Sequence, residues 1–314
     1  MTRVLILDPL WPMDIGMEVL DGIDVTLEKA DRIEGDDVVA VLVAPEQTIP
    51  ANLLELVPNV RLVGTCSTGY DNIPAVELSA QGVMCLHVKS YCDEEVAEHT
   101  VTLAANLLRG VAQLDGFVRE GGWWPYPREP RRLAGSRLGI IGFGRIGRLV
   151  AIQGDALRME VVAFDEFVDE ATMQSLGVQK VDLDTLIETS DVVTLHAPLL
   201  PETQHLMNAR RFAQMRDDAY LVNCARGPLV DHVALGDALR MGVIAGAAID
   251  VYPVEPPPAD EPAFGWPNLI LQPHSAWYSA EASLAPYRRQ IADLARFLRG
   301  EEPEGLIMQP EGTR

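Results

Sequence analysis

Three side chains able to exchange a proton or bind an anion stand in the second half of the chain. Arg226, Glu255 and His274 each come shortly after a run of apolar residues that is typical of a buried parallel strand. The carboxyl ends of such strands meet at one edge of a sheet, and ligands bind there in open α/β folds. Hydride transfer to a carbonyl needs an acid/base group, and an acidic substrate needs a fixed cation. The histidine, the glutamate and the arginine would supply both.

Each of these residues also has an ordinary structural explanation. His274 follows Pro273 and could cap the end of a strand, and Arg226 could bridge two acidic surface residues. Glu255 lies in a proline-rich segment and could simply be solvated. His196 is the main competitor of His274, because it also directly ends a predicted strand.

A glycine-rich turn stands where a nucleotide phosphate could bind. Gly142, Gly144 and Gly147 form the pattern GxGxxG between the apolar run 138–141 and a helix predicted to begin near Arg145. The first glycine allows a tight turn, the second lets the backbone approach a pyrophosphate, and the third lets the helix pack closely on the strand. The exposed N–H groups of the helix N-terminus would bind phosphate oxygens. The pattern therefore predicts a dinucleotide site.

Asp165 sharpens this prediction. It ends the next predicted strand, where a carboxylate would accept hydrogen bonds from the hydroxyls of the adenosine ribose. The same carboxylate would repel a 2′-phosphate, which favours NAD over NADP. The alternative is a solvated aspartate in a turn at the end of a strand.

The elements that must position these residues alternate along the chain. Six apolar runs separated by helical segments predict a parallel, doubly wound sheet: 138–142, 161–165, 191–196, 219–223, 245–250 and 269–272. Shorter runs in the first ninety residues indicate a second, smaller α/β domain: 4–8, 25–28, 38–44, 60–66 and 83–88. The last helical stretch, 279–299, contains Pro286, which predicts a kink or two separate pieces.

The middle of the chain predicts one long helix. Helix-compatible spacing runs over residues 93–119, and Gly121 with Gly122 ends it. The aromatic segment 123–127 and the arginine-rich segment 128–132 then form an irregular stretch. Its aromatic side chains could enter a core, or they could pack on a second subunit.

Composition excludes several classes of protein. The 314 residues exceed what one core usually holds, and 48% of them are hydrophobic, which predicts a globular chain of two domains. The net charge of −21 would repel a nucleic acid, and no apolar run approaches the ~20 residues of a membrane span.

The four cysteines form no metal-binding or disulfide pattern, and the beginning of the sequence resembles no export signal, so we expect a cytoplasmic protein with reduced thiols and no metal. Cys66 and Cys224 are interpreted as small buried residues, since hydride transfer needs no nucleophile.

Seven ordered motifs resemble the D-isomer-specific 2-hydroxyacid dehydrogenase family, and together they cover nearly the whole chain. They occupy residues 67–72, 96–100, 138–147, 196–199, 222–227, 248–251 with 255–256, and 273–277. Residues 274–279 are most similar to the branch that includes the C-terminal-binding-protein corepressors, which carry a tryptophan just after the catalytic histidine.

The resemblance implies a fold and an order of domains. A Rossmann domain with a doubly wound parallel sheet, residues 96–284, would be inserted into a smaller flavodoxin-like α/β substrate domain. That substrate domain would consist of residues 1–95, completed by residues 285–314.

The resemblance also implies roles for particular residues. His274 would be the acid/base, Glu255 would hydrogen-bond its imidazole, and Arg226 would bind the substrate carboxylate. The cofactor would be bound by Gly142, Gly144, Arg145, Ile146, Gly147, Asp165, His196, Pro198, Cys224, Ala225 and Asp250. The substrate would contact Ser67, Thr68 and Gly69, and also Trp277, for which ordinary packing is the alternative.

The activity implied is NAD-dependent reduction of a small 2-oxo acid, or oxidation of a D-2-hydroxy acid, by a homodimer. The alternative is an NAD-sensing, corepressor-like binding scaffold with weak dehydrogenase activity. A relative acting on formate or phosphite is a third possibility, although formate enzymes lack the partner that Glu255 would provide. Residues 88–93 depart from the Pro-Gly turn of many relatives, so the resemblance does not identify the 2-oxo acid.

Overall fold

The computed structural model describes residues 2–15, 17–126 and 129–308. The chain divides into two compact units, unit 1 (Met1–Tyr91 with Ser279–Arg314) and unit 2 (Cys92–Tyr278). The division follows Tyr91 and Tyr278, whereas the sequence predicted it a few residues later, after residues 95 and 284. No helix in the described ranges has the length and apolar character needed to cross a bilayer.

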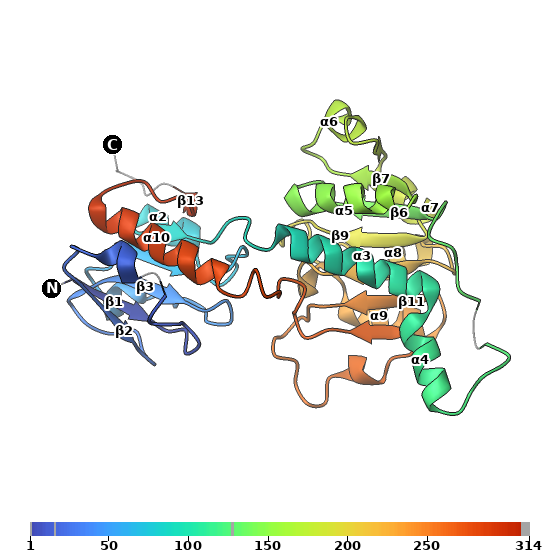
Figure 1. Cartoon of the computed structure of the whole chain (residues 1–314), viewed down its shortest axis with the longest axis horizontal. Coiled ribbons are helices and arrows are strands. Elements are labelled where there is room, and N and C mark those ends of the chain that lie inside the picture. The colour runs from blue at the N-terminus through green and yellow to red at the C-terminus, as the bar shows by residue number, and fades with distance from the viewer. Residues whose placement is uncertain (1, 16, 127–128, 309–314) are drawn as a thin grey trace. The chain divides into compact units, whose positions relative to one another are not determined.

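Unit 1 contains one sheet of six strands, in the order β13-β5-β4-β3-β1-β2 (Figure 1). The strands are β1 (Thr2–Ile6), β2 (Val25–Lys29), β3 (Val38–Val43), β4 (Leu62–Thr65), β5 (Met84–Leu86) and β13 (Leu306–Met308). All neighbours are parallel except β13, which pairs antiparallel with β5. The order 2-1-3-4-5 of the parallel strands is that of a flavodoxin-like sheet, as predicted.

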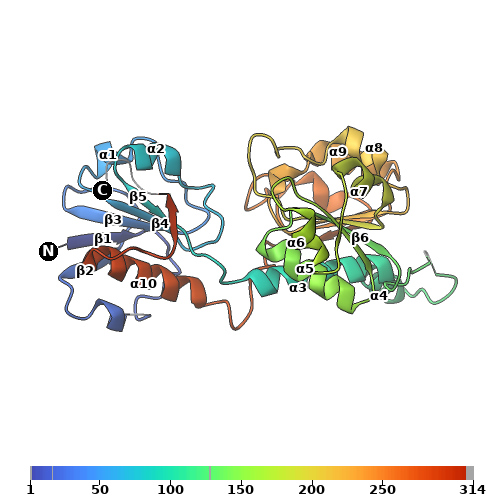
Figure 2. The same ribbon diagram turned by 90° about the horizontal axis from the view of Figure 1, so that it is seen from above.

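Alternating apolar residues give this sheet a core on each face. Val4 and Ile6 of β1 pack with Leu294 of α10 (Ala285–Arg299), while Leu5 belongs to the core of the opposite face. The opposite face is covered by α1 (Leu53–Leu56) and α2 (Ala75–Ala80), and Figure 2 shows these helices across the sheet from α10. A short 3-10 helix, η1 (Met17–Leu20), lies beside α10.

The kink predicted at Pro286 is wrong. Helix α10 begins at Ala285, and Pro286 lies in its first turn, where the missing backbone N–H costs no hydrogen bond. The helix ends at Gly300, whose left-handed φ of 77° is typical of a helix C-terminus. The six residues before Ala285 form turns rather than a first helical piece.

Unit 2 contains one fully parallel sheet in the order β12-β11-β10-β9-β6-β7-β8. The strands are β6 (Arg137–Ile141), β7 (Glu160–Phe164), β8 (Gln179–Lys180), β9 (Val192–Leu195), β10 (Tyr220–Asn223), β11 (Gly246–Ile249) and β12 (Leu269–Leu271). This is the 3-2-1-4-5-6 order of a Rossmann fold with one more strand, so the predicted doubly wound sheet is confirmed. The two-residue strand β8 was not predicted.

Helices cover both faces of this sheet. The helices of unit 2 are α3 (Asp93–Arg109), α4 (Val111–Arg119), α5 (Arg145–Ala156), α6 (Glu170–Gln174), α7 (Leu183–Thr189), α8 (Ala209–Gln214) and α9 (His232–Arg240), with 3-10 helices η2 (Gly227–Leu229) and η3 (Pro262–Gly265). Figure 2 shows α8 and α9 on one side and α3 and α5 on the other. Side chains such as Phe212 and Leu235 fill the first layer against Val193 and Leu221 of the strands.

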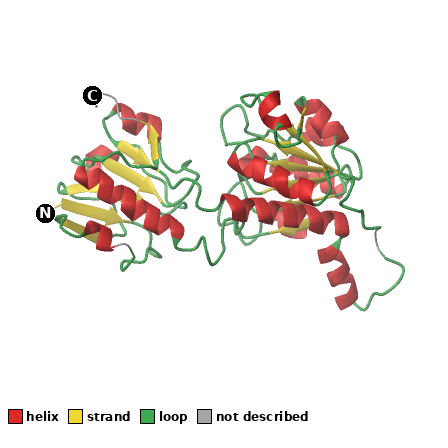
Figure 3. Cartoon of the chain, turned by 45° about the horizontal axis from the view of Figure 1, so that its top comes forward, coloured by secondary structure: helices red, strands yellow, loops and turns green. Residues whose placement is uncertain are grey.

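The single long helix predicted for residues 93–119 is broken. Gly110 takes a left-handed φ of 63°, ends α3 and starts α4 in a new direction. Helix α4 buries none of its residues, and it projects from unit 2 together with the segment that follows (Figure 3). Trp123 and Trp124 are 81% and 73% exposed, so these aromatic side chains do not enter the core of the unit. Pro127 and Arg128 lie outside the described residues.

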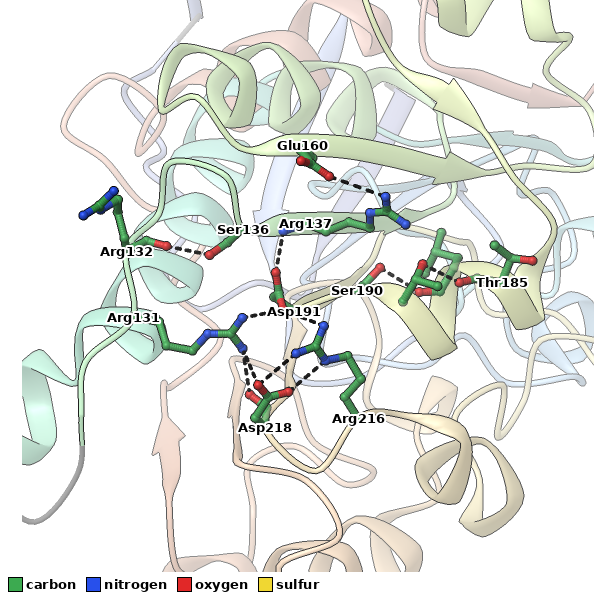
Figure 4. Close-up of polar contacts among 12 residues, drawn as sticks. Arg131, Arg132, Ser136, Arg137, Glu160, Thr185, Ser190, Asp191, Arg216 and Asp218 are labelled. Carbon is green, nitrogen blue, oxygen red and sulfur yellow. Dashed lines mark hydrogen bonds and ion pairs between the residues drawn. The ribbon is translucent and has the colours of Figure 1, made fainter.

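An ion-pair cluster holds the chain where it returns from this projection (Figure 4). The buried carboxylate of Asp191 lies 2.6 Å from Nη2 of Arg131 and 3.5 Å from Nη1 of Arg216. Asp218 pairs with the same two arginines, at 3.1 and 2.9 Å. The second oxygen of Asp191 accepts the backbone N–H of Arg137, so the cluster joins the returning chain to the amino end of β6.

Candidate active site

A histidine–glutamate pair lies beyond the carboxyl ends of β11 and β12. Nδ1 of His274 is 2.6 Å from Oε2 of Glu255, and Oε1 of the same carboxylate accepts the backbone N–H of Tyr252 at 2.8 Å. Both oxygens are therefore held, and the carboxylate fixes the ring. Because Nδ1 faces Glu255, proton exchange with a substrate falls to Nε2 of His274.

The backbone at His274 is held in an unusual conformation. Its φ is 54°, in the left-handed region, and its N–H donates to the carbonyl oxygen of Asp250 at 2.8 Å. The fully buried carboxylate of Asp250 accepts the N–H groups of Ser275 and Ala276 at 2.8 and 2.9 Å. Asp250 thus determines the turn that carries the imidazole. Sequence reasoning assigned it only to the cofactor, although its position at the end of a strand adjacent to that of His274 was a signal.

Electrostatics favour an ionised pair. Burial alone would lower the pKa of His274, but the hydrogen bond and charge of Glu255, with the charge of Asp250, raise it above its ordinary value. Burial acts to raise the pKa of Glu255, whereas the hydrogen bond and charge of His274 bring it below its ordinary value. The charge of Arg226 also lowers the pKa of Glu255, and it acts to lower the pKa of His274. The pair therefore holds a proton on His274 more firmly than a free imidazole would.

The loop after β10 positions Arg226. The buried Asn223 side chain donates to the carbonyl of Arg226 at 2.9 Å and accepts the N–H of Ala225 at 3.0 Å. A Cβ at Gly227 would lie 2.0 Å from the carbonyl oxygen of Tyr252, so only glycine allows the loops after β10 and β11 to touch. Sequence reasoning missed Asn223 and Gly227, because their roles depend on this contact between distant segments.

The glycine turn has the shape that a dinucleotide requires. Gly142 has a φ of 94°, and a Cβ there would lie 2.7 Å from backbone atoms of His196 and Ala197. A Cβ at Gly147 would lie 2.2 Å from the carbonyl oxygen of Gly142, whereas a Cβ at Gly144 would meet nothing within 4 Å. The turn is thus packed on two sides and open on the third.

The start of α5 fits a phosphate. Helix α5 begins at Arg145, has no side-chain cap at Gly144 and has no acidic residue in its first turn. Its first N–H groups, which have no partner within a helix, can therefore bind an anion. The guanidinium of Arg145 pairs with Asp93 at 2.9 Å, and Ile146 is half-buried beside it.

Asp165 links the end of β7 to the glycine turn. Its Oδ2 accepts the N–H of Phe143 at 2.8 Å, and its Oδ1 accepts those of Phe167 and Val168 at 2.8 and 3.2 Å. A carboxylate oxygen can accept more than one hydrogen bond, so these contacts leave capacity for ribose hydroxyls. The group predicted for the adenosine ribose is thereby fixed in place.

His196 differs from His274 in charge. It follows β9 beside Gly142, and burial lowers its pKa to about 4, so it is a neutral imidazole. Its Nε2 is buried and has no hydrogen-bond partner among the described residues. Pro198, two positions further, is exposed.

The remaining predicted residues fall into three places. Cys224 is buried between Asn223 and Ala225, and burial raises its pKa to about 12, so it offers no thiolate. Ser67, Thr68 and Gly69 form a half-buried loop after β4 in unit 1. Trp277 is half-buried, and its ring makes an edge contact with Tyr278 at 5.3 Å between centroids.

Comparison with known proteins identifies the family. Residues 101–276 match the NAD binding domain of the D-isomer specific 2-hydroxyacid dehydrogenases. A glyoxylate reductase of Thermofilum pendens is 36% identical over 273 residues, which cover 85% of this chain and 80% of that protein. The chain belongs to this dehydrogenase family. A glycerate dehydrogenase of Methylorubrum extorquens is 34% identical over 295 residues, covering 89% and 88% of the two chains.

Solved structures agree with this result. The D-lactate dehydrogenase of Aquifex aeolicus, complexed with NAD and lactic acid, superposes on this 2-hydroxyacid dehydrogenase with a TM-score of 0.89. The two are 25% identical, and the alignment covers 99% of this chain and 100% of the other. The predicted enzyme class and the predicted cofactor, NAD, are therefore confirmed.

Proposed function

We propose that this dehydrogenase reduces a short 2-oxo acid, of the size of glyoxylate or hydroxypyruvate, to the D-2-hydroxy acid. The observation that carries the proposal is the 2.6 Å contact between His274 and Glu255, with Arg226 close enough for its charge to act on both. Relatives that are named glyoxylate reductase and hydroxypyruvate reductase support this size of substrate.

The residues of unit 2 divide the work of binding NADH. The first turn of α5, with Arg145 and Ile146, would hold the pyrophosphate beside Gly144. Asp165 would bind the adenosine ribose, and the segments containing His196 with Pro198 and Cys224 with Ala225 would line the remainder. Asp250 would contribute to the nicotinamide end. When bound, the nicotinamide supplies the hydride.

The protein's own groups then move the proton and hold the acid. Nε2 of His274 donates a proton to the ketone oxygen, and Glu255 stabilises the imidazolium before this transfer. Arg226 binds the substrate carboxylate through two parallel hydrogen bonds, a geometry that suits its planar guanidinium. In unit 1 the N–H groups of Ser67, Thr68 and Gly69 would bind a carboxylate, and in unit 2 Trp277 would contact the substrate side chain.

The direct test is NADH oxidation followed by absorbance across a panel of 2-oxo acids. The panel includes glyoxylate, hydroxypyruvate, pyruvate and longer apolar and aromatic acids. We expect the highest kcat/KM with glyoxylate and hydroxypyruvate, which are short and carry no apolar side chain. Absence of turnover with every acid would contradict the proposal. The corepressor-like alternative has no comparable support, since the relatives named above are all enzymes.

We also propose that the protein is a homodimer. The exposed side chains of α4, Trp123, Trp124 and Tyr126 form an apolar projection from unit 2, and large aromatics are enriched at interfaces. Light scattering tests this: a monomeric mass at micromolar concentration would contradict it. Four buried cysteines without a disulfide support a reducing compartment, the cytoplasm.

A further inference from the structure

The loop formed by Ser67, Thr68 and Gly69 has a particular hydrogen-bond pattern. Its three carbonyl oxygens all accept hydrogen bonds, from the Val88 N–H at 2.9 Å, from the His87 ring at 2.7 Å and from the Ser67 hydroxyl at 2.5 Å, respectively. Its three N–H groups donate no hydrogen bond within the described part of the chain. The carbonyl groups of the loop are therefore fixed by hydrogen bonds, and its backbone N–H groups can donate to a ligand.

The donor at His87 can be assigned. Nδ1 of His87 is 2.7 Å from the carbonyl oxygen of Thr68, and a carbonyl can only accept, so Nδ1 carries the proton. The ring also makes an edge contact with Tyr70 of the same loop, with centroids 5.2 Å apart. His87 follows β5 directly, so the sheet of unit 1 fixes where the ring stands.

A hydrogen bond that fixes a carbonyl group also fixes the direction of the N–H group in the same peptide unit. In a trans peptide, the C=O of one residue and the N–H of the next point in opposite directions. The contact of Thr68 O with His87 therefore points the N–H of Gly69 away from the imidazole. In the same way, the contact of Ser67 O with Val88 directs the N–H of Thr68. Two successive donors are thus oriented by the segment that follows β5.

Other contacts hold this part of the chain without the His87 ring. The side chain of Asn72 donates to the carbonyls of Ala44 and Gln47 at 3.1 and 2.9 Å. The hydroxyl of Thr68 donates to the carbonyl of Val88 at 3.0 Å. These contacts fix the position of the loop, so loss of the His87 ring would release chiefly the orientation of the peptide between Thr68 and Gly69.

We propose that His87 is a positioning residue for the substrate carboxylate, acting through the Thr68 carbonyl to aim the N–H of Gly69. The inference rests on the proposed function, in which this loop binds the carboxylate. His87 touches neither substrate nor cofactor in this role, and the proton on its Nδ1 is not transferred.

Two nearly isosteric substitutions separate this role from general packing. In His87→Asn the side-chain nitrogen can replace Nδ1 as donor to Thr68, whereas in His87→Gln the amide is displaced toward the position of Nε2. We expect the KM for glyoxylate to rise about tenfold in His87→Gln and His87→Ala, with kcat within about threefold of wild type, because binding common to ground and transition states is lost. We expect His87→Asn to stay within about threefold of wild type in both constants.

Three further measurements complete the test. The exposed His205, changed to Asn, is the matched control and should leave both constants unchanged. The affinity for NADH should be the same in all His87 variants. Nitrogen chemical shifts of the wild-type ring should report protonation at Nδ1, a result that needs no variant to fold.

Each outcome has one meaning. Three results would overturn the role of His87: equal KM values for His87→Asn and His87→Gln, an unchanged KM in His87→Ala, or a ring proton on Nε2 alone. Turnover of glyoxylate by the wild-type enzyme would still uphold the proposed function in each of these cases. If wild type turns over no 2-oxo acid, the proposed function fails, and the role assigned to His87 fails with it.

Discussion

Nδ1 of His274 lies 2.6 Å from Oε2 of Glu255, and this contact raises the pKa of the imidazole despite its burial. Reduction needs the protonated ring, so kcat/KM for a 2-oxo acid should fall as pH rises through the raised pKa, and oxidation should show the reverse. In Glu255→Gln burial remains but the charge is lost, which lowers that pKa. We expect the falling limb of the reduction profile to move to lower pH. An unmoved limb in Glu255→Gln would show that another group titrates.

Arg226 should not be replaceable by lysine. An ammonium group cannot make two parallel hydrogen bonds to a carboxylate, so Arg226→Lys should lose about 10²-fold in kcat/KM, and Arg226→Gln more. Steady-state kinetics with glyoxylate measure the loss. NADH affinity serves as the control, since it should change little. Full activity of either variant would contradict the assigned role.

Asp250 links stability to acid/base chemistry. Asp250→Asn replaces one of the two acceptors for Ser275 and Ala276 by a donor, so one buried N–H loses its partner. We expect a loss of about 1–3 kcal/mol in the free energy of unfolding. Because the Asp250 charge helps to raise the pKa of His274, the reduction profile should also shift to lower pH. Denaturant unfolding and pH profiles should change together, and a change in only one would refute the dual role.

Gly144 and Gly147 should respond differently to alanine. A methyl group at Gly144 enters open space, so Gly144→Ala should fold with normal stability but weaken NADH binding by about tenfold or more. A methyl group at Gly147 would lie 2.2 Å from the carbonyl of Gly142, so Gly147→Ala should destabilise the unit itself. Thermal unfolding without ligand and titration with NADH distinguish the two effects. Equal stability losses would argue against an open phosphate site.

Asp191 should contribute far more to stability than an exposed acid. Its side chain is 7% exposed and interacts with Arg131, Arg216 and the backbone of Arg137, so Asp191→Ala should cost about 3–5 kcal/mol. The control is Asp237→Ala, which removes an exposed pair with Arg240 and should cost no more than about 1 kcal/mol. Urea unfolding of both variants provides the comparison. Similar losses of unfolding free energy in the two variants would show that the buried cluster stabilises the unit no more than an exposed ion pair does.

Most strands of the two sheets were predictable because a buried parallel strand is a continuous apolar run, as in Val192–Leu195. The antiparallel edge strand Leu306–Met308 was not predicted. The two-residue strand Gln179–Lys180 has no such run. The helix break at Gly110 was missed because a glycine within a helical pattern can either be tolerated or end the helix.

Within the site, Arg226, Glu255 and His274 could be proposed from residue type and strand ends. The supporting residues could not. Gly227 matters only because the loop that contains Tyr252 approaches it, and His87 only because the Thr68 carbonyl faces its ring. Such relationships join segments far apart in sequence and leave no local pattern.

The return of the C-terminal segment to unit 1 has a consequence for biosynthesis. Every strand of unit 2 has been translated by Leu271, whereas one face of the unit 1 core includes Ile291 and Leu294, and its edge strand ends at Met308. On the ribosome, the inserted unit can therefore mature while the earlier-synthesised residues still await their last helix. We expect unit 2 to complete its folding before unit 1, although unit 1 begins first in the sequence. The N-terminal residues of unit 1 should therefore be the part that nascent-chain chaperones must protect longest.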